Sequence, residues 1–369
     1  MGIHYGYSCS GSAAAAVSEA LEGIRRPALV IFSCTLGDFE AVAAELQSRL
    51  PQALTIGTTA AATYSTPFDR AATLTVAAFD DCVCAGGLLR EIGRYPKKYV
   101  GEIRAAVNYV SADGGDGDTL CIEFTTGAQK ADELVQDTYR SVLKDTAVKL
   151  AGGTSAVNCC GVSRVAWDGE VYDDASAFVI MRNPGKKIRL YSHNSYAPGG
   201  LTLQATRVDV QTRTVYEYDH MPAADAVAQA LCMPRQQFEH VCADYPIGCL
   251  NGDGLRISSA AAVNRDGSIV YRSRIYGYTT VHLLVNSYEP LTLLRSQLCS
   301  MSDKDNREHS FALIVSCGTR LQSAERLGLL EKGAALTEDI MGPNMLIATD
   351  GEQLNGIHVN QTMITVLFE

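Results

Sequence analysis

The sequence predicts an α/β (α+β) protein: an internally duplicated strand-helix-strand region with mixed sheets, followed by a β-rich α+β region. Strands and helices alternate up to about residue 182, and extended segments dominate afterwards. With 369 residues the chain exceeds what one hydrophobic core usually serves, so we expect two domains, at 1–233 and 234–369. The duplication rests on a motif of small and hydroxyl residues, Thr55-Ile56-Gly57-Thr58-Thr59-Ala60-Ala61, which recurs as Leu150-Ala151-Gly152-Gly153-Thr154-Ser155-Ala156.

The first copy covers about residues 27–110. A helix is expected before it over Ser12–Arg26, where apolar residues recur at helical spacing until Pro27 ends the pattern. Within the copy we expect strands at 28–34, 54–56 and 72–79, and a helix over 39–50 that Asp38 caps and Pro51 closes.

The second copy covers about residues 119–182 and has the same order of elements. We expect strands at 119–124 and 175–181, a helix over 132–143, and a hairpin over 163–171 that turns at Asp168-Gly169. Between the copies, the polar and glycine-rich stretch 111–118 is typical of a linker.

The remainder predicts a β extension of the first domain, and then a second domain beginning near Met233-Pro234. The extension has segments at 187–192, 202–210 and 214–218 and a helix over 222–231. From Phe238 onward we expect antiparallel β structure, with strands at 257–263, 269–274 and 280–285. A helix over 289–299 follows. The rest of the chain is expected to form strands at 310–317, 345–349 and 361–368 and helices at 323–332 and 338–341.

Composition excludes several classes of protein. The net charge of −10 argues against a nucleic-acid partner, because phosphate binding requires clustered Lys and Arg. No run of about 18 apolar residues occurs, and the N-terminus has no signal-peptide pattern, so we expect a cytoplasmic protein without a membrane partner. Twelve cysteines in a chain of this length fit a reducing compartment better than a disulfide scaffold.

Several motifs together resemble the FIST family, in its N-terminal and C-terminal domains. They are Ile56-Gly57-Thr58-Thr59-Ala60, Gly152-Gly153-Thr154-Ser155-Ala156, Trp167-Asp168-Gly169-Glu170-Val171, Tyr245-Pro246-Ile247-Gly248, Val315-Ser316-Cys317-Gly318-Thr319-Arg320, Asp350-Gly351-Glu352 and His358-Val359-Asn360-Gln361-Thr362. The resemblance implies a bacterial small-molecule sensor in signal transduction, with amino acids among its ligands and heme in some members. Because no output segment follows Glu369, we expect a freestanding sensor that signals through an unknown protein partner. The chain departs from the family pattern at Thr58, Ala61, Ala62 and Asn158, where the family favours Cys, Gly, Glu and Asp.

The candidate ligand-binding residues follow strand ends. Exposed backbone N–H and hydroxyl groups there are typical of small-ligand sites, although the glycines would equally serve tight turns. Arg320 is a candidate for clamping a carboxylate, and Glu352 with His358 for an acid–base pair or for orienting an amine, with turn capping as the alternative. The full set is Gly57, Thr58, Thr59, Gly152, Gly153, Thr154, Ser155, Asn158, Cys317, Arg320, Glu352, His358 and Asn360.

No catalytic residue, metal site or cofactor is predicted. Neither Cys82-Val83-Cys84 nor Cys159-Cys160 has zinc-ligand spacing. Noncovalent heme would need an axial ligand from His4, His193, His220, His240 or His282. Three other functions stay open: an enzyme acting on a small metabolite through Cys317 or the Glu352 and His358 pair, a heme-based gas sensor, and a scaffold without a ligand. The sequence does not determine the oligomeric state.

Overall fold

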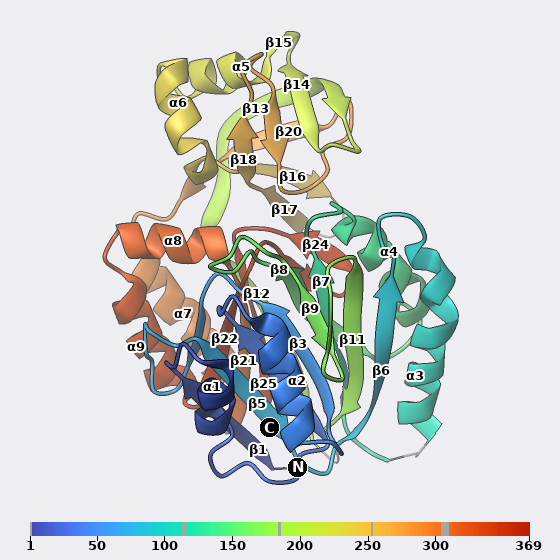
Figure 1. Cartoon of the computed structure of the whole chain (residues 1–369). Helices are drawn as coiled ribbons and strands as arrows, with labels where there is room; N and C mark the ends of the chain where they lie inside the picture. The colour runs from blue at the N-terminus through green and yellow to red at the C-terminus, as the bar shows by residue number, and fades with distance from the viewer. Residues whose placement is uncertain (1, 113–114, 184–185, 252–253, 304–309) are drawn as a thin grey trace. The chain divides into compact units, whose positions relative to one another are not determined.

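A computed structural model describes residues 2–112, 115–183, 186–251, 254–303 and 310–369 (Figure 1). Its elements confirm the predicted α/β class, with mixed sheets and flanking helices. The chain divides into two compact units, and each is discontinuous in sequence. Unit 1 comprises 1–193, 295–357 and 363–369, and unit 2 comprises 194–294 and 358–362. These units differ from the expected division at residue 233, because the segment 194–294 is inserted into unit 1.

The first copy in unit 1 is built on a parallel strand pair. Strand β2 (Leu29–Cys34) pairs in parallel with β3 (Leu54–Thr59) through α2 (Phe39–Arg49), and β5 (Leu74–Phe79) pairs antiparallel on the other side of β2. The carboxylate of Asp38 accepts a hydrogen bond from the Ala41 amide and caps α2 as expected. The copy also contains β1 (Ile3–Ser8), α1 (Ala13–Ala20) and β4 (Thr63–Ser65).

The second copy repeats this arrangement. Strand β7 (Thr119–Thr126) is parallel to β8 (Lys149–Ser155) through α4 (Asp132–Leu143), and β11 (Ala175–Arg182) is antiparallel to β7. The expected hairpin is confirmed and turns at Asp168 and Gly169, both with positive φ. The other elements are β6 (Val83–Arg90), the short 3-10 helix η1 (Pro96–Tyr99), α3 (Val100–Ala112), β9 (Val165–Trp167) and β10 (Glu170–Tyr172). The first copy was expected to extend to residue 110, but β6 pairs with β11, so the segment from β6 to α3 belongs to the second copy.

The sequence did not predict helix α3, and it occupies the start of the expected linker at 111–118. Residues 113 and 114 lie outside the described part of the chain. At the end of that stretch, Asp118 pairs with Lys149 at 2.5 Å and accepts the Ile188 amide at 3.0 Å. The last residue of the stretch therefore anchors two strands of unit 1.

The structure adds a third copy that the sequence analysis did not identify. Strand β21 (Phe311–Cys317) is parallel to β22 (Asn344–Thr349), and β25 (Thr362–Phe368) is antiparallel to β21. This is the strand arrangement of the first two copies. The other elements of this copy are β12 (Ile188–Asn194), α7 (Pro290–Asp303), α8 (Gly318–Arg326), α9 (Leu330–Met341), β23 (Glu352–Leu354) and β24 (Ile357–Val359).

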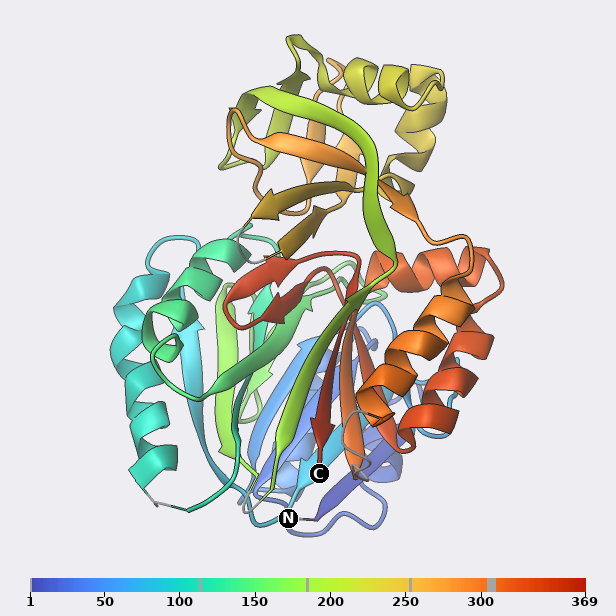
Figure 2. The same ribbon diagram turned by 180° about the vertical axis from the view of Figure 1, so that it is seen from behind.

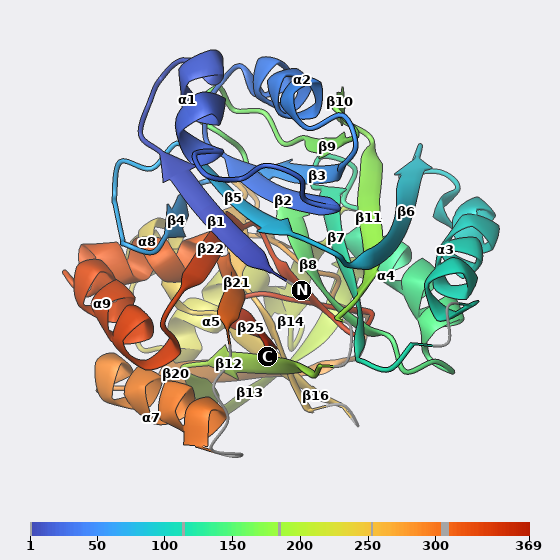
Figure 3. The same cartoon turned by 90° about the horizontal axis from the view of Figure 1, so that it is seen from below.

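The three copies exchange strands in a closed circuit. Strand β9 of the second copy pairs antiparallel with β3 of the first, β23 of the third pairs with β8 of the second, and β4 of the first pairs with β22 of the third. The three sheets face one common core, to which Ile31, Ile122 and Leu313 contribute fully buried side chains. Figure 3 shows helices outside the sheets, with α1 and α2, then α3 and α4, then α7 and α9 on successive sides.

Unit 2 is an antiparallel sheet with strand order β17-β16-β20-β13-β14-β19-β18. Its longest strand, β13 (Tyr196–Asp209), is strongly curved in Figure 2 and has an irregular register against β20 between Pro198 and Thr202. The remaining elements are β14 (Thr214–Tyr218), β15 (Met221–Pro222), α5 (Ala223–Ala230), α6 (Arg235–Val241), η2 (Cys242–Asp244), β16 (Ile247–Asn251), β17 (Gly254–Ser258), β18 (Ala260–Val263), β19 (Ile269–Tyr271) and β20 (Thr280–Asn286). Helix α6 lies where the sequence analysis expected antiparallel β structure to begin.

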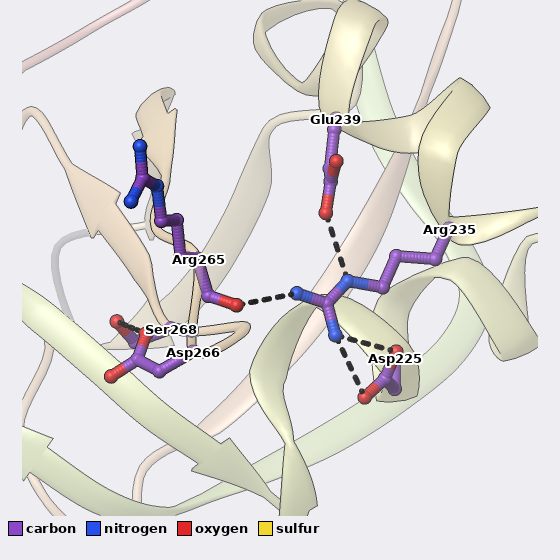
Figure 4. Close-up of polar contacts among 6 residues, drawn as sticks. All are labelled: Asp225, Arg235, Glu239, Arg265, Asp266 and Ser268. Atoms are coloured by element: carbon purple, nitrogen blue, oxygen red, sulfur yellow. Dashed lines mark hydrogen bonds and ion pairs between the residues drawn. The ribbon is translucent and has the colours of Figure 1, made fainter.

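One arginine joins the two helices of unit 2 to a hairpin turn (Figure 4). The guanidinium of Arg235, at the start of α6, donates to Glu239 at 2.8 Å and pairs with Asp225 of α5 at 3.3 Å. It also donates to the carbonyl of Arg265, in the turn between β18 and β19. These partners explain the orientation of the side chain, and we interpret the group as structural.

Candidate functional site

The candidate residues in unit 1 follow the carboxyl ends of the parallel strands. Thr58 of the first copy lies beside Ser155 of the second, with their hydroxyl oxygens 2.7 Å apart. The neighbouring Thr59 hydroxyl donates to the carbonyl of Ala156 at 2.9 Å. Both threonines and Ser155 have no exposed surface. The two strand ends are therefore in direct contact, joined by hydroxyl groups.

The glycines at these strand ends allow neighbouring groups to pack closely. A Cβ on Gly57 would lie 2.2 Å from the Phe32 ring, and one on Gly152 would lie 1.9 Å from the carbonyl oxygen of Glu123. A Cβ on Gly153 would lie 2.5 Å from the Cγ2 methyl of Thr349, which belongs to the third copy. The space that each glycine leaves is thus filled by protein atoms.

The third copy brings polar groups to the same strand ends. Gln353 donates to the Thr154 hydroxyl at 3.0 Å, and that hydroxyl donates to Asp132 at 2.5 Å. Thr349 donates to the carboxylate of Glu352 at 3.2 Å, and both residues have no exposed surface. Glu352 therefore belongs to the buried layer of the site.

Asn158 organises its own loop. Its amide nitrogen donates to the Leu36 carbonyl at 2.9 Å, and its side-chain oxygen accepts from the amides of Cys160 and Val162. The first bond holds the loop after β8 against the loop after β2, and the other two stabilise the loop after β8 itself. A turn-stabilising role therefore explains the residue.

Cys317 and Arg320 stand at the start of α8. Cys317 occupies the N-cap position and has no exposed surface, and a thiol in such surroundings is inert as a nucleophile. Arg320 is half-buried, and its charge contributes to lowering the pKa of His193. Arg320 is therefore the candidate at this strand end that combines a charge with access to solvent.

His358 and Asn360 belong to unit 2, whereas the other eleven candidates lie in unit 1. Both are buried, with exposed fractions of 2% and 0%. The adjacent Gln361 donates to the carbonyl of Ala243 in the same unit at 3.4 Å. The pairing of His358 with Glu352 stays a prediction.

A buried polar network that was not predicted from the sequence lies beneath α4. Glu123 has no exposed surface, and its carboxylate accepts from Thr125 at 2.6 Å, Gln136 at 2.8 Å and Ser176 at 3.2 Å. Ser176 also lies 2.9 Å from the hydroxyl of Tyr139. Since Ile122 and Phe124 face the common core, the alternation of a strand directs Glu123 to the opposite face, toward α4.

Burial raises the pKa of Glu123 to about 8, and the charge of Asp132 adds to this effect, while the three donors act against it. At neutral pH the carboxyl group is therefore mostly protonated. Two features of the sequence could have revealed this buried polar network. Glu123 interrupts the apolar run Leu120–Phe124, and Asp132, Gln136 and Tyr139 recur at intervals of about one helical turn on the buried face of α4.

Two of the candidate heme ligands, His193 and His4, have side-chain partners in unit 1. His193, which is buried, has its Nε2 atom 3.1 Å from the sulfur of Met301, and burial with the Arg320 charge lowers its pKa to about 4. Axial ligation through this nitrogen would require it to leave Met301, and heme binding stays a prediction. His4 pairs with Asp80 at 2.8 Å and is half-exposed. Within the described ranges, no three His, Cys, Asp or Glu residues are placed to hold a metal ion.

A family model and a solved structure are similar to this chain. No curated protein matches the sequence. A solved structure described as chorismatase is 12% identical, with a TM-score of 0.38 over 100% of this chain and 98% of that chain. The FIST N domain matches residues 28–221, which include the first two copies from β2 onward. This match covers more than half of the 369 residues of the chain, and the chain therefore belongs to the FIST family.

Proposed function

We propose that this protein is a sensor that binds an amino acid or a related small metabolite at the strand ends of unit 1. The FIST domain is associated with signal transduction and small-ligand sensing. The expected bacterial and cytoplasmic setting and the signalling protein partner are part of this proposal. None of the helices in the described ranges is long and apolar enough to cross a membrane.

The observation that carries the proposal is the direct contact between strand ends of different copies. Thr58 meets Ser155, and the backbone of Thr154 exchanges hydrogen bonds with Asp350 and Gly351 at 2.9 and 2.8 Å. Polar groups from all three copies are thereby concentrated at the carboxyl ends of parallel strands, where small ligands bind in open α/β sheets. The close packing makes their positions fixed before a ligand arrives.

The charges near these strand ends suit a zwitterion. Arg320 can present a bidentate donor pair to a carboxylate, and Asp350 can accept an ammonium group. Both residues are half-buried, whereas Glu352 behind Thr349 is fully enclosed. Amino acids carry both of the complementary charges, which is why we favour them over other metabolites.

A thermal-shift screen of the full chain tests the proposal. Amino acids, related metabolites and hemin are added singly, and a ligand at about 100 times its Kd should stabilise the folded chain by roughly 2.7 kcal/mol, a shift of several degrees. We expect a shift with at least one amino acid. The absence of any shift across the panel would overturn the proposal, and a shift with hemin alone would replace it with a heme-based function.

Variants of α8 test the proposed site. R320A should abolish the ligand-induced shift, and R320K should weaken binding because Lys lacks the bidentate fork. R326A is the matched control, since Arg326 lies on the same helix but is exposed and donates to Ser323. Equal ligand affinity in R320A and R326A would exclude Arg320 from the site.

A further inference from the structure

The loop between β8 and β9 exposes two adjacent thiols. Of the twelve cysteines, Cys9, Cys159, Cys160 and Cys232 are exposed, and Cys159 and Cys160 are the neighbours among them. Their sulfur atoms lie 3.9 Å apart. Nothing in the proposed ligand site uses this pair.

The protein holds both thiols above a single glycine. A Cβ on Gly37 would lie 2.4 Å from the sulfur of Cys160 and 3.8 Å from that of Cys159, so both sulfurs pack over this residue. Asn158 fixes the loop by accepting the Cys160 amide at 3.0 Å and donating to the Leu36 carbonyl at 2.9 Å. The two sulfurs are thus on the same side of a loop that the fold positions.

We propose that Cys159 and Cys160 form a redox-modification site, a vicinal dithiol that a peroxide converts reversibly into a disulfide. In the first step the thiolate of one cysteine attacks a peroxide oxygen, the O–O bond breaks, and a sulfenic acid and hydroxide (or the alkoxide of an organic peroxide) form. In the second step the other sulfur attacks the sulfenic sulfur, the S–O bond breaks, and water leaves with the proton of that thiol. The two sulfurs lose two electrons in total, and the peroxide accepts them.

The surroundings assign an order to the two thiols. The pKa of Cys160 is raised, first because its thiol hydrogen-bonds to Cys159 and then by the charge of that neighbour. The raised pKa of Cys160 suits it to the role of resolving group, which leaves Cys159 as the attacking group. Nearby Cys34 stays protonated, because burial raises its pKa to about 12.

Geometry makes the product easy to reduce. Closing the bond brings the sulfurs from 3.9 Å to about 2.05 Å. Adjacent Cα atoms are about 3.8 Å apart, below the range of about 4.4–6.8 Å that unstrained disulfides prefer. Strained, exposed disulfides have higher reduction potentials and are the labile ones, so a dithiol reductant should restore the thiols.

Mass spectrometry of the full chain tests the site. The protein is treated with one equivalent of hydrogen peroxide, alkylated with iodoacetamide and digested. We expect the peptide with Cys159 and Cys160 to lose two hydrogens and to take up no alkyl group, and to take up two after treatment with dithiothreitol. C160S should leave a sulfenic acid on Cys159 that dimedone traps, and C159S should react with peroxide several-fold more slowly.

C9S and C232S are the matched controls, because each removes an exposed thiol from another surface and should leave the disulfide unchanged. Melting curves of all four variants should coincide with that of the wild type. The proposal is overturned if both thiols remain alkylatable at a peroxide dose that oxidises Cys9. It is equally overturned if the product is a disulfide between two chains, or sulfinic acid without prior loss of the two thiols.

Discussion

Replacing Glu123 with glutamine tests how unit 1 accommodates a buried carboxyl group. Glutamine keeps the shape and an oxygen acceptor for Gln136, and the hydroxyls of Thr125 and Ser176 can accept from its amide. The substitution removes the titration. We therefore expect E123Q to be more stable than the wild type at alkaline pH and similar to it at acidic pH.

The size of the expected stability difference between E123Q and the wild type follows from the raised pKa of Glu123. A carboxyl group of ordinary pKa 4.5 in the unfolded chain and about 8 in the folded chain costs roughly 5 kcal/mol once both states are ionised, and roughly 3 kcal/mol at pH 7. The sign is set by proton binding, because between these two pKa values the folded protein holds a proton that the unfolded chain has released. Stability therefore falls as pH rises from about 4.5 to about 8 and is level above that.

Urea unfolding of wild type and E123Q at pH 5, 7 and 8.5 measures this effect as a difference, so that other titrating groups cancel. The increase in the free energy of unfolding that E123Q produces should become larger from pH 5 to pH 8.5. E102Q is the matched control, since Glu102 is an exposed carboxylate on α3, and its difference should stay within about 0.5 kcal/mol at every pH. A gain that does not vary with pH would refute the reasoning, as would a loss of several kcal/mol at pH 8.5.

The remaining predictions concern contacts between copies. G153A should destabilise the protein by about 1–3 kcal/mol, because the added methyl group would lie 2.5 Å from Cγ2 of Thr349. T349S removes that methyl group, so G153A/T349S should recover part of the loss in urea unfolding, and strict additivity would show that the clash is not the cause. T58V should cost about 1–3 kcal/mol by leaving the buried Ser155 hydroxyl without this partner. Thermal unfolding of T58V, S155A and the double variant measures the coupling, which should exceed about 0.5 kcal/mol for groups in direct contact.

The first two copies could be predicted from sequence because their apolar strands, helices and glycine turns recur in order. The third copy was missed for two physical reasons. Its parallel strand ends in Ala348-Thr349 without a glycine, since Thr349 itself fills the space beside Gly153. In addition, the segment 194–294 separates β12 from the rest of the copy, so the elements are not contiguous in sequence.

For the site, spacing and residue type located the strand ends but did not reveal how closely they pack. Thr58 and Ser155 were among the candidates, and their contact depends on the pairing of β3 with β9 from the other copy, which no local pattern specifies. Glu123 was missed because its helical partners lie on a separate element. The side chains it contacts become apparent only when α4 is placed over β7.

The circular exchange of edge strands means that no copy is complete by itself. A chain ending before the third copy would leave β8 without β23 as its edge partner, and β4 without β22. Bare strand edges template association with other chains, so such a fragment should oligomerise or aggregate. A shorter protein with a single copy could pair these edges by assembling as a threefold homotrimer, in which a strand of each subunit pairs with the sheet of the next.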